Sequence, residues 1–255
     1  MAIQKAEAFV LQRRPLRETS LIVTLLTREF GKIKVVAKGV RTGKSPTASI
    51  LEPFTCLSIV YYEKTRSDIH LLSQASVIRT NSHLRNDLNC FGYASYMSEF
   101  VEQVCQIQDP HPDIFDLMNG AFDVLSRLPF LKVVRVFEVK LFGMVGWLPA
   151  LTSCIGCGEK VHEQAYFSSK HGGILCARCH HGEGRGIVIS KDTIQTLLYF
   201  LKLPIEQASM IAVGKQIEAE LTAIIEKFLR YRLEYPLNSS HFMSEIGHLF
   251  NKKTS

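Results

Sequence analysis

The sequence predicts an α+β protein with more than one domain: a small β-barrel, followed by a helical domain that carries a four-cysteine metal module. Three observations support this. The first 80 residues have the pattern of short strands separated by turns, whereas from residue 82 onward apolar residues recur every three or four positions. Two Cys-x-x-Cys pairs interrupt the helical part. We therefore expect domains at residues 1–80 and 81–255, with the metal module inserted at 150–186.

Five segments of the N-terminal part are typical of β-strands. Residues 6–11 are mostly apolar and end at a polar run, and residues 21–26 are short and rich in β-branched side chains. Residues 32–38 alternate basic with apolar side chains, which predicts one buried face and one row of lysines. Two more strands are expected at residues 54–62 and 69–78. Five strands in so short a stretch fit a closed or nearly closed barrel, for which the OB-fold is the commonest form.

The rest of the chain has the apolar spacing of amphipathic helices. Prolines divide this part, and the stretch before the paired cysteines is the most apolar, so we expect it at the centre of the helical core. The expected helices cover residues 82–108, 113–128, 130–147, 190–203 and 214–235.

Positive charge is concentrated at the N-terminus. The whole chain has a formal net charge of +6, but residues 1–80 hold 13 basic and six acidic side chains, a net of +7. This asymmetry predicts a polyanion partner for the barrel, although an ordinary solvated face would also carry lysines. The candidate contacts lie on the lysine-rich strand, the loop after it and the first polar run: Lys32, Lys34, Lys38, Arg41, Lys44, Arg13, Arg14 and Arg17.

Aromatic side chains are interleaved with these basic residues. Most phenylalanines of the barrel are expected in its core. Tyr61 and Tyr62 are adjacent on one predicted strand, so they point to opposite faces and one of them must face outward. An outward tyrosine can stack on a nucleic-acid base.

Four of the seven cysteines form two Cys-x-x-Cys pairs separated by 18 residues. Each pair can wrap one tight turn, and together they supply four thiolates, a set that selects Zn²⁺ over Mg²⁺ or Ca²⁺. Four protein ligands leave no open coordination position, so one structural zinc ion is expected. His180 and His181, which follow directly, are expected in solvent and not as ligands. The ligands would be Cys154, Cys157, Cys176 and Cys179.

No enzymatic motif is complete. Residues 39–45 resemble a phosphate-binding loop, but three residues instead of four separate Gly39 from Gly43, and no βαβ unit surrounds them. We therefore expect a protein that is not an enzyme. The N-terminus has no apolar signal core, and the longest uncharged run, residues 141–158, contains a proline and four glycines. These features predict a cytoplasmic protein without a membrane span.

The order of these parts resembles a known family. The N-terminal segments look like the bacterial recombination mediator RecO, and the helical part interrupted by paired cysteines is similar to the zinc-containing members of that family. The resemblance covers essentially the whole chain. At the N-terminal end it is carried by residues 8–11, 17–21, 27–31, 36–41, 44–45 and 51–54.

The resemblance implies an OB-fold, a helical domain and an embedded zinc finger. It also implies binding of single- and double-stranded DNA, annealing of complementary strands, and an association with the nucleoid. Together with RecR, such a protein helps load RecA onto DNA covered by single-strand-binding protein, whose acidic tail it contacts through the helical domain. The DNA contacts transfer most directly to the basic positions between Lys32 and Lys44, and less directly to Arg13, Arg14 and Arg17.

Two other readings remain open from the residues alone. One is an enzyme that binds nucleotides through residues 39–45. The other is a zinc-containing scaffold that recognises a specific DNA sequence through basic residues of the metal module, namely Lys160, Lys170, Arg178 and Arg185.

Overall fold

The computed structural model describes residues 2–41, 46–161, 164–180 and 186–239. They divide into two compact units: unit 1 contains the residues up to Ser126 together with those from Leu237 onward, and unit 2 is Arg127–Pro236. The chain thus leaves unit 1 once and returns to it once. The domain boundary expected near residue 80 falls inside unit 1.

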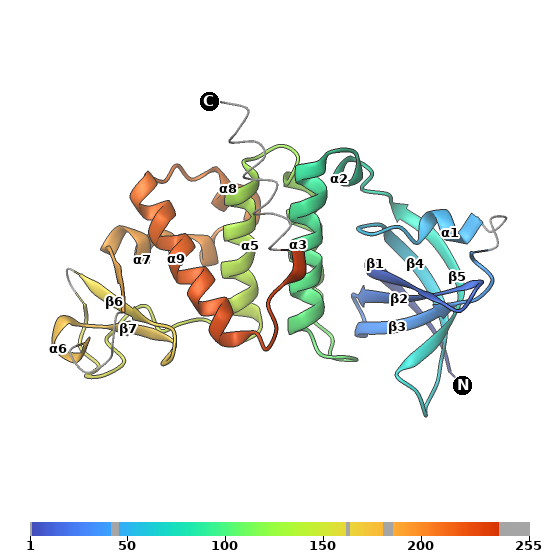
Figure 1. The fold of residues 1–255 in the computed structure, drawn as a ribbon, viewed down its shortest axis with the longest axis horizontal. Helices are drawn as coiled ribbons and strands as arrows, with labels where there is room; N and C mark the ends of the chain where they lie inside the picture. The colour runs from blue at the N-terminus through green and yellow to red at the C-terminus, as the bar shows by residue number, and fades with distance from the viewer. Residues whose placement is uncertain (1, 42–45, 162–163, 181–185, 240–255) are drawn as a thin grey trace. The chain divides into compact units, whose positions relative to one another are not determined.

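Five strands form the N-terminal barrel (Figure 1), and its predicted fold class is confirmed. The strands close in the order β1-β2-β3-β5-β4, and every neighbouring pair is antiparallel except β3 and β5, which run parallel. This is a five-stranded OB-type barrel. Its elements are β1 (Ala2–Leu16), β2 (Ser20–Thr27), β3 (Gly31–Ala37), the short helix α1 (Pro46–Ile50), β4 (Cys56–Glu63) and β5 (Ile69–Arg79).

Every second side chain along each strand points into the barrel interior and fills it. In β3, for example, Ile33 and Val35 are fully buried, whereas Lys32, Lys34 and Val36 alternate with them and keep exposed surface. Small alanines of β1 and aliphatic side chains of the other strands complete this core. The alternation fixes which face each barrel residue presents.

β1 is longer than the sequence pattern predicts. The polar run after residue 11 does not form a loop but continues the strand to Leu16, paired with β2 from Gln12↔Thr24 to Leu16↔Ser20. A β-bulge between Val10 and Gln12 shifts the register where the apolar part ends. The hairpin partner supplies the backbone hydrogen bonds of this segment, so its polar side chains can stand in solvent on both faces.

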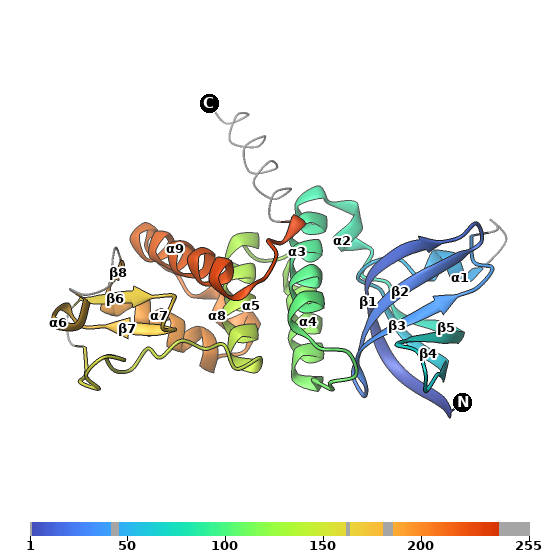
Figure 2. The same cartoon turned by 60° about the horizontal axis from the view of Figure 1, so that its bottom comes forward.

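Three helices complete unit 1: α2 (His83–Asn86), α3 (Leu88–Val104) and α4 (Pro112–Val124). Asp87 caps α3 by accepting a hydrogen bond from the Cys90 backbone N–H, 2.8 Å away. Figure 2 shows α3 and α4 beside the barrel. The helices therefore belong to the same compact body as the strands.

An aromatic seam joins the barrel to α4. The ring of Phe9 lies 4.6 Å from that of Phe115 and 5.6 Å from that of Phe122, and Phe54 lies 5.7 Å from Phe122. All four side chains are buried. Phe9 faces outward from β1, so α4 closes over a part of the barrel exterior.

Unit 2 is built around α5, which contacts α7, α8 and α9. A three-stranded sheet in the order β7-β6-β8 and the short helix α6 accompany them. The sequence pattern predicts α5, α7 and α9, but neither α8 nor the sheet. The elements are α5 (Phe130–Met144), β6 (Ala165–Ser168), β7 (Gly173–Leu175), α6 (Ala177–His180), β8 (Ile187–Ile189), α7 (Lys191–Lys202), α8 (Ile205–Met210) and α9 (Lys215–Arg232).

None of the helices within the described ranges is long and apolar enough to cross a membrane.

Two carboxylates hold chain segments that are distant in sequence. In unit 2, Glu220 of α9 accepts hydrogen bonds from the Ser190 backbone N–H at 2.7 Å and from the Thr193 hydroxyl at 2.6 Å, at the start of α7. In unit 1, Glu99 of α3 accepts from the backbone N–H groups of Asn238 at 2.9 Å and Ser239 at 2.8 Å. The second carboxylate thus anchors the chain where it returns to unit 1.

Candidate nucleic-acid interface and metal centre

The lysine-rich strand presents its basic side chains outward. Lys32 and Lys34 occupy alternate positions of β3, Val36 takes the next one, and Lys38 follows the end of the strand as an exposed residue. Their common face is the exterior of the barrel, because the residues between them are in the core.

Lys32 is held by the last turn of α3 and the loop that follows it. Its ammonium group donates a hydrogen bond to the carbonyl oxygen of Glu102, and its own carbonyl accepts the Gln108 backbone N–H at 2.9 Å. Burial lowers the pKa of Lys32. The neighbouring Gly31 has a positive φ of 66°, and a Cβ there would lie 2.0 Å from the carbonyl oxygen of Asp109. Residues 102–109 therefore cover this end of β3. Lys34 is the first lysine of the strand that they leave uncovered.

Arg13 and Arg14 point to opposite faces of the β1–β2 hairpin. Arg13 lies opposite Val23, a core residue, and forms an ion pair with Glu52 at 2.8 Å. Arg14 lies opposite Ile22 on the exterior and is exposed. Only Arg14 therefore shares the outer face with Lys34.

Arg17 and Arg41 meet at the tip of the same hairpin. The Arg41 guanidinium donates to the carbonyl oxygen of Arg17 at 2.8 Å, and the Arg41 backbone N–H donates to that of Thr19 at 2.9 Å. Both arginines are exposed, and Arg17 has a positive φ of 55°. The structure therefore brings two of the predicted basic residues together from separate loops. Lys44, like residues 42–45 as a whole, lies outside the described residues.

The four paired cysteines converge in unit 2. Their sulfur atoms all lie within 4.8 Å of one another, and Cys157 Sγ is 3.8 Å from Cys176 Sγ. In structural zinc sites sulfur lies about 2.3 Å from the metal, so the edge of a regular tetrahedron is about 3.8 Å. Cys154 is buried and Cys157 is exposed, so the cluster sits at the rim of its fold. The four thiols fit a single tetrahedral metal ion.

Hydrogen bonds prepare Cys154 for ionisation. Burial raises the pKa of this thiol, but backbone N–H donors outweigh burial and lower the pKa to about 6. Two of the donors are Cys176, 3.3 Å from Cys154 Sγ, and Gly156, 3.4 Å away. Hydrogen bonds with Cys176 and Cys154 instead raise the pKa of Cys179 to about 12. A cation between the sulfurs would favour ionisation of all four.

His180 packs beside the cluster without joining it. Its ring stacks on Tyr166 with 3.9 Å between centroids and an interplanar angle of 6°. A Cβ on Gly186 would lie 3.0 Å from the His180 ring, and the side chain is half-buried, so the imidazole is less solvated than expected. His181 lies outside the described residues.

Among the described residues of the metal module, the other basic side chains do not gather into one patch. Arg178 is paired with Glu159. Lys160 and Lys170 are exposed, and Arg185 lies outside the described residues. The module therefore offers less free positive charge than its sequence predicts.

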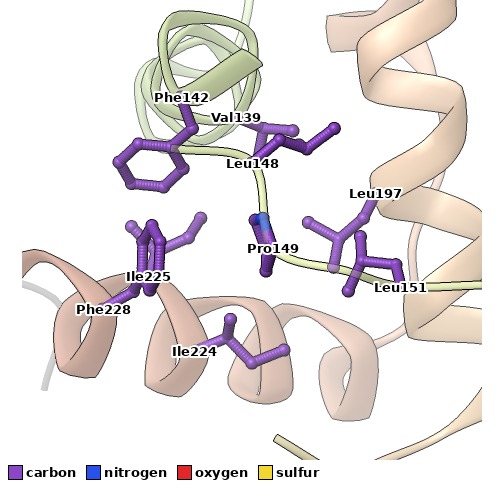
Figure 3. A pocket seen from close by; sticks show the side chains of 9 residues that line it. All are labelled: Val139, Phe142, Leu148, Pro149, Leu151, Leu197, Ile224, Ile225 and Phe228. Atoms are coloured by element: carbon purple, nitrogen blue, oxygen red, sulfur yellow. The ribbon is translucent and has the colours of Figure 1, made fainter. Parts of the chain in front are cut away.

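Unit 2 also contains a small apolar pocket (Figure 3). Figure 3 shows Pro149 at its centre, between side chains of α5 and α9. The pocket offers no polar side chain to a ligand, and the segment that leads into the cysteine module packs against the helices here. Its lining is Val139, Phe142, Leu148, Pro149, Leu151, Leu197, Ile224, Ile225 and Phe228.

Comparison with known proteins accounts for nearly the whole chain. Residues 1–81 match the family profile described as recombination protein O N terminal, and residues 85–241 match the one described as recombination protein O C terminal. DNA repair protein RecO of Caldanaerobacter subterraneus subsp. tengcongensis is 29% identical over 97% of this chain and 100% of its own length. DNA repair protein RecO of Anaeromyxobacter sp. (strain K) is 31% identical over 96% of this chain and 97% of its own length.

Proposed function

The chain belongs to the recombination protein O family of DNA repair proteins, and on that premise we propose that it is a recombination mediator. It binds single- and double-stranded DNA without sequence preference and anneals complementary strands. Together with RecR, it helps load RecA onto DNA covered by single-strand-binding protein. It acts in the cytoplasm, at the nucleoid, and catalyses no bond chemistry.

The observation that carries this proposal is the basic exterior of the barrel. Arg14, Lys34 and Lys38 face outward, and Arg17 and Arg41 meet at the hairpin tip. Each phosphate that these side chains neutralise releases condensed counterions, which favours binding of any sequence. Two strands held on such a surface repel each other less, so their bases can pair.

The cysteine cluster supports a structural role for Zn²⁺. Four thiolates satisfy zinc completely and leave no position for a substrate. Cys154, Cys157, Cys176 and Cys179 would hold one ion, which would join the turn before β6 to α6. When bound, the ion would supply folding energy to this small module.

The helical unit is the proposed contact for protein partners. Its apolar pocket can accept at most a small apolar side chain, such as one from the tail of single-strand-binding protein. Polar anchors for such a tail would have to lie outside the pocket lining.

An annealing assay in the presence of single-strand-binding protein tests the proposal. The charge-reversed variant Lys34→Glu/Lys38→Glu/Arg41→Glu should lose annealing and binding to both DNA forms, because all three residues face outward from the barrel. The matched control Lys160→Glu/Lys170→Glu changes exposed lysines of the metal module and should behave as wild type. Normal annealing by the barrel variant would refute the proposal, and loss confined to the control would move the DNA contact to the metal module.

A further inference from the structure

A row of apolar side chains runs round the outside of the barrel, across all five strands. Strand register places its members directly opposite one another: Ile22↔Val36 between β2 and β3, Val36↔Leu71 between β3 and β5, Tyr62↔Leu71 between β4 and β5, and Ile3↔Tyr62 between β1 and β4. We call Ile22, Val36, Leu71, Tyr62 and Ile3 the outer apolar row.

These side chains face solvent and not the core. The residues next to them on the same strands, such as Val35 and Tyr61, are buried in the barrel interior, so the row residues point the other way. Each keeps accessible surface, and Ile3 is 65% exposed. Other outward apolar residues of the barrel are covered by α4: Phe9 and its strand partner Leu26 are fully buried there, whereas Val77 and Ile78 near the end of β5 stay 40% and 51% exposed. The row therefore differs from the part of the barrel exterior that α4 covers.

The border of the row is basic. On a strand, the residues two positions before and after a given residue share its face. The charged residues at these positions are Lys5 on β1 and Lys34 on β3, and Lys38 and Lys64 directly follow the ends of β3 and β4. Arg14 adds a fifth positive charge, because it lies directly opposite Ile22. An apolar band between cations matches a ligand that has apolar faces and carries negative charge along its length.

Resting on the proposed function, we propose that the outer apolar row binds the unpaired bases of single-stranded DNA. Tyr62, the aromatic member, stacks on one base, the aliphatic members pack against its neighbours, and the lysines pair with the phosphates. A single strand can follow the curvature of a closed barrel, whereas a duplex keeps its bases stacked inside and resists bending over a few base pairs. The row thus distinguishes unpaired from paired DNA on a surface whose charges attract both.

Binding of three labelled DNA ligands to the full chain tests this: a single strand of thymidines, an abasic strand of the same length, and a duplex. The variant Tyr62→Leu keeps an apolar side chain but cannot stack, so its affinity for the thymidine strand should fall about tenfold. Its affinity for the abasic strand and for the duplex should not change. Tyr62→Phe should restore binding of the thymidine strand. The matched control is Tyr199→Leu, which removes a tyrosine that is 52% exposed on α7 and should have no effect.

Equal loss on all three ligands would show a general defect and overturn the proposal. Unchanged DNA binding combined with loss of a complex with RecR would identify the row as a protein surface and overturn it too. A failure of the base-binding row must be told apart from a failure of the proposed function. Binding of the abasic strand by the barrel charge variant Lys34→Glu/Lys38→Glu/Arg41→Glu separates the two. If that variant loses affinity but Tyr62→Leu binds the thymidine strand normally, only the base-binding row is wrong. If both variants bind normally, the barrel is not the DNA-binding surface.

Discussion

Arg28 of the β2–β3 turn and Asp116 of α4 are joined by two hydrogen bonds between guanidinium and carboxylate. Arg28 Nη1 lies 3.1 Å from Asp116 Oδ2, and Nη2 contacts the other carboxylate oxygen. A second pair, Arg79–Asp123 at 2.7 Å, lies two helical turns further along α4. Each of these acidic residues directly follows a phenylalanine of the aromatic seam, Asp116 after Phe115 and Asp123 after Phe122, so charge and apolar packing fix α4 to the barrel at the same two places. Arg28 and Arg79 are two of the basic residues that give the N-terminal part its positive charge, and both are already paired with carboxylates.

The aromatic seam should contribute much more stability than the ion pairs. Phe122 is fully buried against Phe9 and Phe54, so Phe122→Ala should lower the free energy of unfolding by about 3–5 kcal/mol. Asp116→Ala, at an exposed pair, should cost less than about 1 kcal/mol. Urea denaturation followed by far-UV circular dichroism measures both. Fluorescence of Trp147, the single tryptophan, reports on unit 2 as an internal control. Equal costs for the two variants would contradict this ranking.

Lys34 and Lys32 should differ in DNA binding although they are two residues apart on one strand. Lys34→Ala should reduce the slope of log affinity against log salt by about 1, because one phosphate contact is lost. Lys32→Ala should leave that slope unchanged, since its ammonium group is already bonded to the Glu102 carbonyl. Fluorescence anisotropy over a salt series distinguishes them. A larger change for Lys32→Ala would mean that Lys32 leaves the Glu102 carbonyl when DNA binds.

Metal content should depend on the cysteines and not on the adjacent histidine. Cys154→Ser removes the buried sulfur that accepts two backbone hydrogen bonds, so metal bound per chain should fall from about one to near zero. His180→Ala should retain the metal, because this ring stacks on Tyr166 outside the sulfur cluster. Elemental analysis of purified protein gives both values. Metal loss in the histidine variant alone would refute the assignment of four cysteine ligands.

Acid should weaken the contact between α9 and the start of α7. Burial raises the pKa of Glu220, but hydrogen bonds from Ser190, Thr193 and Gln216 outweigh it and the pKa is lowered. Since the folded pKa lies below the unfolded value, this carboxylate stabilises the fold above its ordinary pKa of 4.5. That stability is lost as the pH falls through the folded pKa.

Glu220→Gln should therefore lower the Tm of unit 2 at neutral pH, and the difference from wild type should shrink in acid. Thermal unfolding followed by Trp147 fluorescence measures this at each pH. Glu218→Gln, at an exposed carboxylate of the same helix, is the matched control. A pH-independent difference for Glu220→Gln would show that its effect is not electrostatic.

Sequence periodicity predicts the parts of this protein whose backbone conformation is determined by residues that are close in sequence. Alternation in β3, helical spacing in α5 and α9, and the spacing of the paired cysteines are of this kind, and the structure has all of them. In each case burial of one face or closure of one tight turn decides the local conformation, so few long-range contacts are needed.

Long-range contacts decide the features that the sequence pattern misses. The polar end of β1 is a strand because β2 pairs with it, and not because of its own residues. Lys32 has the pattern of a free surface lysine, but a carbonyl 70 positions away binds it. The sheet strands β6, β7 and β8 contain only three or four residues each, too few to show a period. The outer apolar row likewise becomes visible only when register aligns residues of five strands.

Because the chain leaves unit 1 after Ser126 and returns to it at Leu237, unit 2 is inserted within unit 1. Leu237 is buried, and Glu99 binds the two residues that follow it. A pulling force applied at Ala2 and Ser239 would therefore load unit 1 first, and the cysteine cluster would bear no tension until the Glu99 contact breaks.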